Sequence, residues 1–269
     1  MNNVHLEIKV LKKINYINNS ELRENSAIKK LAYNHAANYE GNNYTKKIED
    51  DFIESYLLTD KKLNYKSSEE LFLAVDELDK NRTQSQLAYN LIISLDHKIS
   101  YEANLKVLNE LLTETFLKNN LVCDVSIHNK DNANLHSHIL VPIREISEDG
   151  KLGKKFRRGF NNKDFNSYFL RKKLAEKFNE ERRKNGIAEQ IDYRSNEQKI
   201  ELLLQQNKIE EALTFNYKAV DKKYSKNKAF RKQRIAAAED LQEKYDETAR
   251  ILNNSLNQQE FLYQQTKKF

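Results

Sequence analysis

The chain has 269 residues, of which 39% are hydrophobic and 32% charged, and its net charge at pH 7 is +6. This length fits one domain with an appendage or two small domains, and fourteen Tyr with twelve Phe argue against a disordered chain, because such chains are poor in aromatic residues. The longest apolar runs are too short to span a bilayer, and a single cysteine without a secretory leader leads us to expect a cytoplasmic protein that does not enter a membrane.

Predicted strands and helices alternate in the first half of the chain. Alternating apolar and polar residues indicate half-buried strands, whereas apolar residues at helical spacing indicate amphipathic helices. Ser26 and Ser100 stand where helix N-caps are expected, and the SSEE sequence that starts at Ser67 is a typical helix start. The predicted elements are strands over 4–10, 53–58 and 91–95, and helices over 26–39, 67–79 and 100–117.

The second half begins with two strands and continues with helices. The turn residues NKDNAN separate strands over 121–128 and 135–144, which predicts an antiparallel hairpin in which Pro142 lies near a strand end. A helical pattern runs over 164–185 and ends at Gly186. Beyond 195 nearly all of the sequence has a helical pattern. We therefore predict an α+β domain over 1–195 and a helical region over 196–269.

Three of the six histidines fall within the predicted hairpin. His136 and His138 are two residues apart on a strand and share a face, and His128 ends the preceding strand. Three imidazoles at hairpin reach can converge on one divalent metal ion and leave coordination positions open for a substrate oxygen. The alternative is the exposed polar face of an antiparallel strand, which needs no metal.

Other metal chemistry could use the same three histidines. A cupin-like oxygenase would contain more short strands and many more than five glycines. A metal-bound water, as in carbonic-anhydrase-type chemistry, stays open.

Basic residues cluster in two segments. One runs over 151–163 with no acidic residue, and Lys218 to Arg234 contains eight basic residues and one acid. Such clusters neutralise phosphates and bind nucleic acid in a salt-dependent way. Two solvated faces are the alternative explanation of the same pattern.

The histidine segment DVSIHNKDNANLHSHILVPIR (124–144) resembles the motif of the MobA/MobL family of relaxases, within the HUH endonuclease superfamily. Agreement of several segments in the right order is more specific than any one of them, and the resemblance covers about residues 3 to 198. The other similar segments are SAIKKLAYNHAANY (26–39), RTQSQLAYNLIISLDHKIS (82–100), EDGKLGKKFR (148–157) and NEERRKNGIAEQIDYRS (179–195).

The resemblance implies a fold, a reaction and its residues. The implied fold is a central antiparallel sheet of about five strands with helices on its faces. Tyr33 would be the nucleophile that nicks single-stranded DNA at an origin of transfer and forms a 5′-phosphotyrosine, and His128, His136 and His138 would hold Mg²⁺ or Mn²⁺. Accessory relaxosome proteins and a coupling protein would be further partners. The residues that we expect to contact DNA are Arg144, Lys151, Lys154, Lys155, Arg157 and Arg158.

The sequence departs from the family pattern in places. Ser137 stands between the paired histidines, and Asp96 replaces the family's proline. The acidic residue expected on the preceding strand falls near Asn90, so the acidic helper stays unassigned between Asp96 and Asp124. We interpret His5, His35 and His97 as structural, and for Arg144 a surface ion pair is as good an interpretation as DNA contact.

Three rival functions stay open. A rolling-circle replication initiator or transposase would use a tyrosine after the motif, such as Tyr168 or Tyr193. A non-catalytic DNA-binding protein with helical dimerisation would form no covalent adduct. A hydrolytic or oxygenase metalloenzyme would act on a small molecule.

Overall fold

The computed structural model describes residues 5–17, 21–44, 51–82, 84–130, 134–156 and 166–206, together with 208, 211, 243, 246–247 and 250–251. The chain divides into two compact units, residues 1–193 and 194–269. The described part of the second unit contains α5 (Asn196–Gln205). The boundary predicted near 195 is close to this division. That the two parts are separate domains stays a prediction. Among the described residues, no helix is both long and apolar enough to cross a membrane.

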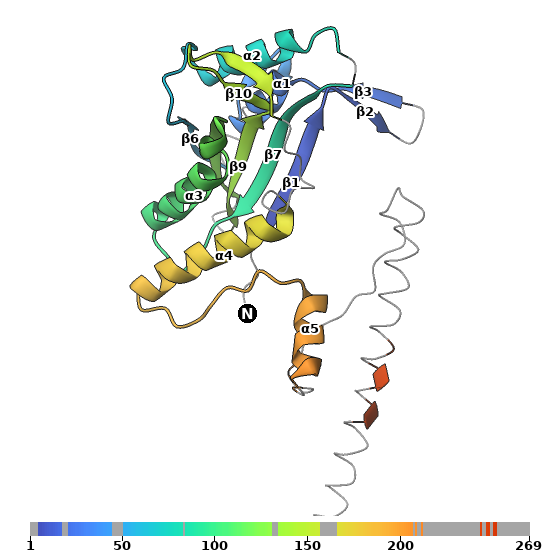
Figure 1. Ribbon diagram of the computed structural model, residues 1–269, viewed down its shortest axis with the longest axis vertical. Coiled ribbons are helices and arrows are strands. Elements are labelled where there is room, and N and C mark those ends of the chain that lie inside the picture. Colours follow the sequence, from blue (N-terminus) through green and yellow to red (C-terminus); the bar gives the residue numbers. More distant parts are fainter. Residues whose placement is uncertain are drawn as a thin grey trace, which may run out of the picture. The chain divides into compact units, whose positions relative to one another are not determined.

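Five strands form the central sheet of the first unit, in the order β1-β7-β9-β8-β6 (Figure 1). Every neighbouring pair is antiparallel. The predicted histidine hairpin is therefore β8 and β9, with β9 at the centre of the sheet. The strands are β1 (Leu6–Lys12), β6 (Phe52–Leu58), β7 (Gln86–Ser94), β8 (Cys123–Lys130) and β9 (Asn134–Pro142).

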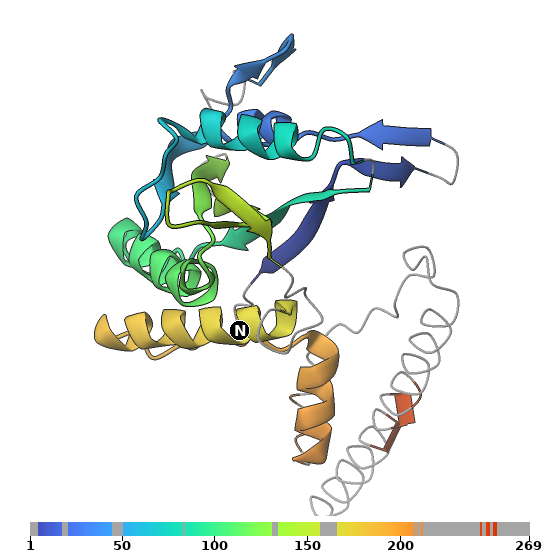
Figure 2. The same cartoon turned by 45° about the horizontal axis from the view of Figure 1, so that its top comes forward.

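Helices cover the two faces of this sheet, with α1 and α2 on one face and α3 and α4 on the other (Figure 2). Alternation along β9 explains this division: Ile139 and Val141 pack with α3 and α4, whereas Leu140 packs with α1 and α2. These layers confirm the α+β sheet of about five strands. The helices are α1 (Ala27–Asn34), α2 (Ser68–Leu78), α3 (Tyr101–Thr115), followed by the 3₁₀ turn η2 (Leu117–Asn119), and α4 (Ser167–Lys184).

Local capping signals in the sequence correspond to the observed helix starts. Ser26, Ser67 and Ser100 each accept a hydrogen bond from the backbone N–H three residues later. The predicted extent of the first helix is wrong, because α1 ends at Asn34 rather than at 39. Ala36 has φ of 51°, which is outside the right-handed helical region. The chain then turns into the small hairpin of β4 (Asn38–Tyr39) and β5 (Asn42–Asn43).

Two further two-stranded hairpins were not predicted as strands. The Asn-rich segment after β1 forms β2 (Ile14–Ile17) and β3 (Glu21–Glu24). The predicted Asp149-Gly150 turn joins β10 (Arg144–Ile146) to β11 (Leu152–Lys155). These strands are only three or four residues long, which is too short for alternation to identify a strand in a sequence.

Candidate active site

The three histidines of the hairpin lie against one another on the α1 side of the sheet. His128 and His136 are directly opposite each other in the register of β8 and β9, and His138 is the next residue of that face on β9. The three ring centroids are 5.5 Å apart for His128 and His136, 4.8 Å for His128 and His138, and 5.0 Å for His136 and His138. The structure therefore brings together the ligand set that was predicted from spacing.

Tyr33 lies next to this histidine cluster, although it is far from it in the sequence. Its ring meets that of His138 edge to face, with centroids 6.4 Å apart. Tyr44 packs against the same tyrosine ring at 5.4 Å, and the ammonium group of Lys30 is 4.4 Å from its centroid. Fourteen tyrosines are present in the chain, and α1 carries this one to the histidines.

Hydrogen bonds to backbone carbonyls orient two of the imidazoles. Nε2 of His128 donates to the carbonyl oxygen of Asn34 at 2.7 Å, and Nδ1 of His136 donates to the carbonyl oxygen of Asn134 at 2.7 Å. Histidines that bind metals characteristically donate their second ring N–H in this way. Asn34 directly follows Tyr33, so the end of α1 contacts a predicted metal ligand.

A divalent cation fits the residue types and the ring spacing of the cluster. With metal–nitrogen bonds of about 2 Å, three imidazoles around one ion have ring centroids about 5 Å apart, as these do. In the described ranges, however, no group of three or more His, Cys, Asp and Glu side chains has the arrangement of a metal-ion site. The imidazoles would have to turn from their present orientations to bind an ion.

Asp124 is buried on the same face of β8 and contacts the tyrosine helix. Its Oδ1 accepts a hydrogen bond from Nε2 of His35 at 2.8 Å, and its Oδ2 accepts one from the Ser68 hydroxyl at 2.7 Å. Burial alone would lower the pKa of His35, but the hydrogen bond and charge of Asp124, aided by Glu69, raise that pKa above its ordinary value. His35 therefore links the end of α1 to β8, and nothing in the local sequence indicates this contact across 89 positions.

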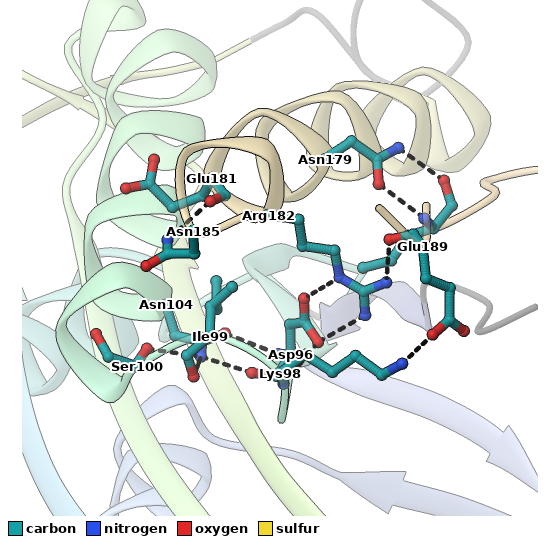
Figure 3. A network of polar contacts seen from close by, with 11 residues as sticks. Asp96, Lys98, Ile99, Ser100, Asn104, Asn179, Glu181, Arg182, Asn185 and Glu189 are labelled. Atoms are coloured by element: carbon teal, nitrogen blue, oxygen red, sulfur yellow. Dashed lines mark hydrogen bonds and ion pairs between the residues drawn. The ribbon is translucent and has the colours of Figure 1, made fainter. Parts of the chain in front are cut away.

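Asp96, the other candidate for the acidic helper, has a structural partner on α4 (Figure 3). The guanidinium group of Arg182 holds both carboxylate oxygens, at 2.5 and 2.8 Å, and both side chains are buried. Although burial would raise the pKa of Asp96, the Arg182 hydrogen bonds and the N–H of Lys98 lower it. α4 lies on the sheet face opposite the histidines, and this ion pair joins it to the segment that follows β7.

Arg144 does not lie on an open surface. It is 8% exposed, and its guanidinium group contacts Asp79 at 3.1 Å and donates to the Gly153 carbonyl at 2.9 Å. Lys155 joins the same carboxylate at 3.1 Å. These contacts favour the ion-pair interpretation of Arg144 over DNA contact, and the pair is buried rather than at the surface.

Only part of the predicted basic DNA-binding segment is described and exposed. Lys151 and Lys154 are exposed, whereas Arg157, Arg158 and Lys163 lie outside the described residues. This hairpin follows the end of β9, whereas His136 is near the start of that strand. At about 3.3 Å per residue, the start of this hairpin and His136 are on the order of 25 Å apart along the strand. The segment 218–234 also lies outside the described residues.

The downstream tyrosines lie on the other side of the sheet. Tyr168 is on α4 and packs against Tyr193, with ring centroids 5.4 Å apart. α4 covers the face that carries Ile139 and Val141, whereas the histidines project from the opposite face. The arrangement therefore disfavours the rolling-circle or transposase alternative, which would use one of these two tyrosines.

Comparisons with known proteins identify a family and similar folds. The model of the MobA/MobL family matches residues 25–212. A solved structure concerning the molecular basis of vancomycin resistance transfer in Staphylococcus aureus is 24% identical, with a TM-score of 0.56, and the match covers 72% of this chain and 99% of that one. At this level of identity, the likeness shows a similar fold and nothing more.

Another similar structure is the metal-bound conjugative relaxase TrwC in complex with oriT DNA. It is 13% identical with a TM-score of 0.43, and the match covers 93% of this chain and 99% of that one. A comparison with curated proteins gives no match.

Proposed function

This chain belongs to the MobA/MobL family, and from that membership and the site geometry we propose that it is a relaxase that nicks one DNA strand at a plasmid origin of transfer. One observation carries the proposal. Tyr33 of α1 lies edge to face against His138, beside a cluster of three histidines on β8 and β9. A nucleophile and a set of cation ligands that meet from separate segments are the parts that phosphodiester cleavage requires.

In the proposed reaction the Tyr33 hydroxyl attacks the scissile phosphorus. The new bond joins the tyrosine oxygen to phosphorus, and the bond from phosphorus to the 3′ oxygen of the preceding nucleotide breaks. The tyrosine gives up its proton during the attack, and the leaving oxygen gains one as a free 3′-hydroxyl. The strand remains attached through a 5′-phosphotyrosine, so the reverse reaction can rejoin it.

His128, His136 and His138 would hold Mg²⁺ or Mn²⁺, which when bound supplies positive charge that polarises the phosphate and stabilises the transition state. Tyr44 packs edge to face against the Tyr33 ring. The carbonyl oxygen of Asn34 orients His128 and couples that ligand to the end of α1.

Single-stranded DNA is the proposed substrate, since its backbone can bend into the site. α1 and α2 cover the histidine face only in part, and Ile92, Ser94 and His136 are partly exposed beside α1. Aromatic and basic residues bind single strands through stacking and phosphate contacts. The exposed Lys9 lies on the neighbouring edge strand of this face and could meet a phosphate.

The test is a nicking assay with single-stranded oligonucleotides from the transfer origin beside the gene, in the presence of Mn²⁺ or Mg²⁺. The unaltered chain should give a covalent species on denaturing gels, and Tyr33→Phe should give neither product nor adduct while binding the oligonucleotide with similar affinity. Tyr168→Phe is the matched control and should react normally. An adduct that persists in Tyr33→Phe, or that is lost in Tyr168→Phe, would contradict the assignment.

A further inference from the structure

Two contacts from the same face of β8 hold the C-terminal end of α1. His128 bonds to the carbonyl oxygen of Asn34 at 2.7 Å, and Asp124 bonds to the ring of His35 at 2.8 Å. Residues four apart on a strand share a face, so both contacts come from one side of β8. Tyr33 directly precedes Asn34, the last residue of α1, and His35, which caps that end. Its position over the histidines therefore depends on how this end of α1 sits on the strand.

The contact between His35 and Asp124 is shielded from solvent. Asp124 is fully buried and the side chain of His35 is 13% exposed. The hydroxyl of Ser68 binds the second carboxylate oxygen, and Glu69 approaches the other ring nitrogen of His35 at 3.9 Å. A buried hydrogen bond to a charged group is strong and directional, because water cannot replace either partner.

A different carboxylate holds the opposite end of α1. Asp76 of α2 accepts hydrogen bonds from the Ser26 hydroxyl and from the backbone N–H groups of Ala27 and Ile28, at 2.7, 2.8 and 3.1 Å. These contacts cap the helix N-terminus, one to two turns from Tyr33. The eight-residue helix thus has an acidic attachment at each end, and only the attachment through Asp124 lies beside the tyrosine.

We propose that His35 and Asp124 are positioning residues for the nucleophile. Their buried contact fixes the end of α1 on β8, in the position where the Tyr33 ring contacts His138. An eight-residue helix has little stability of its own, so tertiary contacts must set its position. Small misplacements of a reacting group reduce rates strongly, by about a hundredfold for 1 Å. This inference rests on the proposed nicking activity.

The test compares single-turnover cleavage by His35→Ala, His35→Gln, Asp124→Asn and Asp76→Asn, with the Kd for the oligonucleotide and the thermal unfolding midpoint measured alongside. His35→Ala should slow cleavage by about tenfold to a hundredfold, as loss of a supporting contact does, with little change in Kd. His35→Gln should recover part of the rate, because its amide can still donate to Asp124. Asp124→Asn weakens the same contact from the other partner and replaces His35→Ala in the test if that variant does not fold.

Asp76→Asn is the matched control, since it weakens the other end of the same helix. It should lower the unfolding midpoint but cleave at close to the rate of the unaltered chain. Hydrogen exchange should become faster at residues 33–36 in His35→Ala and at residues 28–30 in Asp76→Asn.

The outcomes separate this inference from the proposed function. Normal cleavage by folded His35→Ala and Asp124→Asn, while Tyr33→Phe is inactive, would overturn the positioning role alone. Equal slowing in Asp76→Asn and His35→Ala would also overturn it, because general weakening of α1 would then explain the loss. No adduct with the unaltered chain would overturn the nicking activity and this inference together.

Discussion

His128 and His136 face each other across β8 and β9, with their rings 5.5 Å apart, at the point where the ring of His138 also converges. A polar strand face alone would explain one such pair, but not the approach of Tyr33 to the third ring.

The histidine cluster should bind one divalent cation. Replacing His136 and His138 together by Ala should abolish stoichiometric Mn²⁺ binding in calorimetry, because a single imidazole cannot hold the ion. His97→Ala, which changes an exposed histidine that is not one of the three, is the control and should bind normally. Undiminished binding by the double variant would show that the cluster is not the metal site.

The contact between His35 and Asp124 should make stability depend on pH. The pKa of His35 is raised in the folded protein by Asp124 and Glu69, so its stabilising effect is fully present below the ordinary histidine pKa of about 6.5. It is lost as the pH rises through the raised value. The difference in free energy of unfolding between the unaltered chain and His35→Gln should therefore shrink as pH increases. A difference that is constant from acidic to alkaline pH would mean that this contact does not raise the pKa of His35.

The buried ion pair of Arg182 and Asp96 should matter for stability rather than for nicking. Arg182→Met leaves a buried carboxylate without its partner and should lower the free energy of unfolding by about 3–5 kcal/mol in urea titrations. Lys106→Met removes an exposed ion pair to Glu181 and should cost about 0–1 kcal/mol. Equal effects of the two substitutions would contradict the importance assigned to burial.

Arg144 and Lys154 should respond differently to replacement by Ala. Arg144→Ala removes one of the two cations that contact the buried Asp79 carboxylate, and Lys155 remains as the other. It should destabilise the fold by about 1–3 kcal/mol, with DNA affinity of the folded protein retained. Lys154 is 80% exposed, so Lys154→Ala should leave stability unchanged. If Lys154 contacts a phosphate, the salt slope of DNA binding should fall by about one. Salt titrations of DNA affinity together with urea unfolding would separate these effects, and a reversed pattern would restore Arg144 as the DNA contact.

The region after 195, which is predicted to be helical, should not be needed for cleavage. A chain ending at Ser195 should fold and cut a short single strand at the normal rate, because the proposed site residues lie within residues 33–138. It should bind a longer hairpin-containing origin more weakly and with a smaller salt slope, since it lacks the basic segment 218–234. A folded truncated protein that cannot cut the short strand would show that the predicted domain boundary is wrong.

Local features of the sequence were enough to predict much of the fold. Ser26, Ser67 and Ser100 indicated three helix starts because a cap acts on the N–H groups just after it. The spacing of His128, His136 and His138 indicated their shared position, since a hairpin brings residues together by register alone. The family resemblance, not the spacing, selected Tyr33 among fourteen tyrosines.

Only the tertiary structure decided what surrounds these residues. His35 bonds to Asp124, which is 89 positions away in the sequence. Asp96 pairs with Arg182 of α4, so that carboxylate is not available to the histidine site. Arg144 looked accessible in the sequence but is buried on Asp79, because burial depends on which elements pack over a residue. Capping and alternation act within a few residues and can be recognised locally, whereas charge pairing and burial arise when distant segments meet.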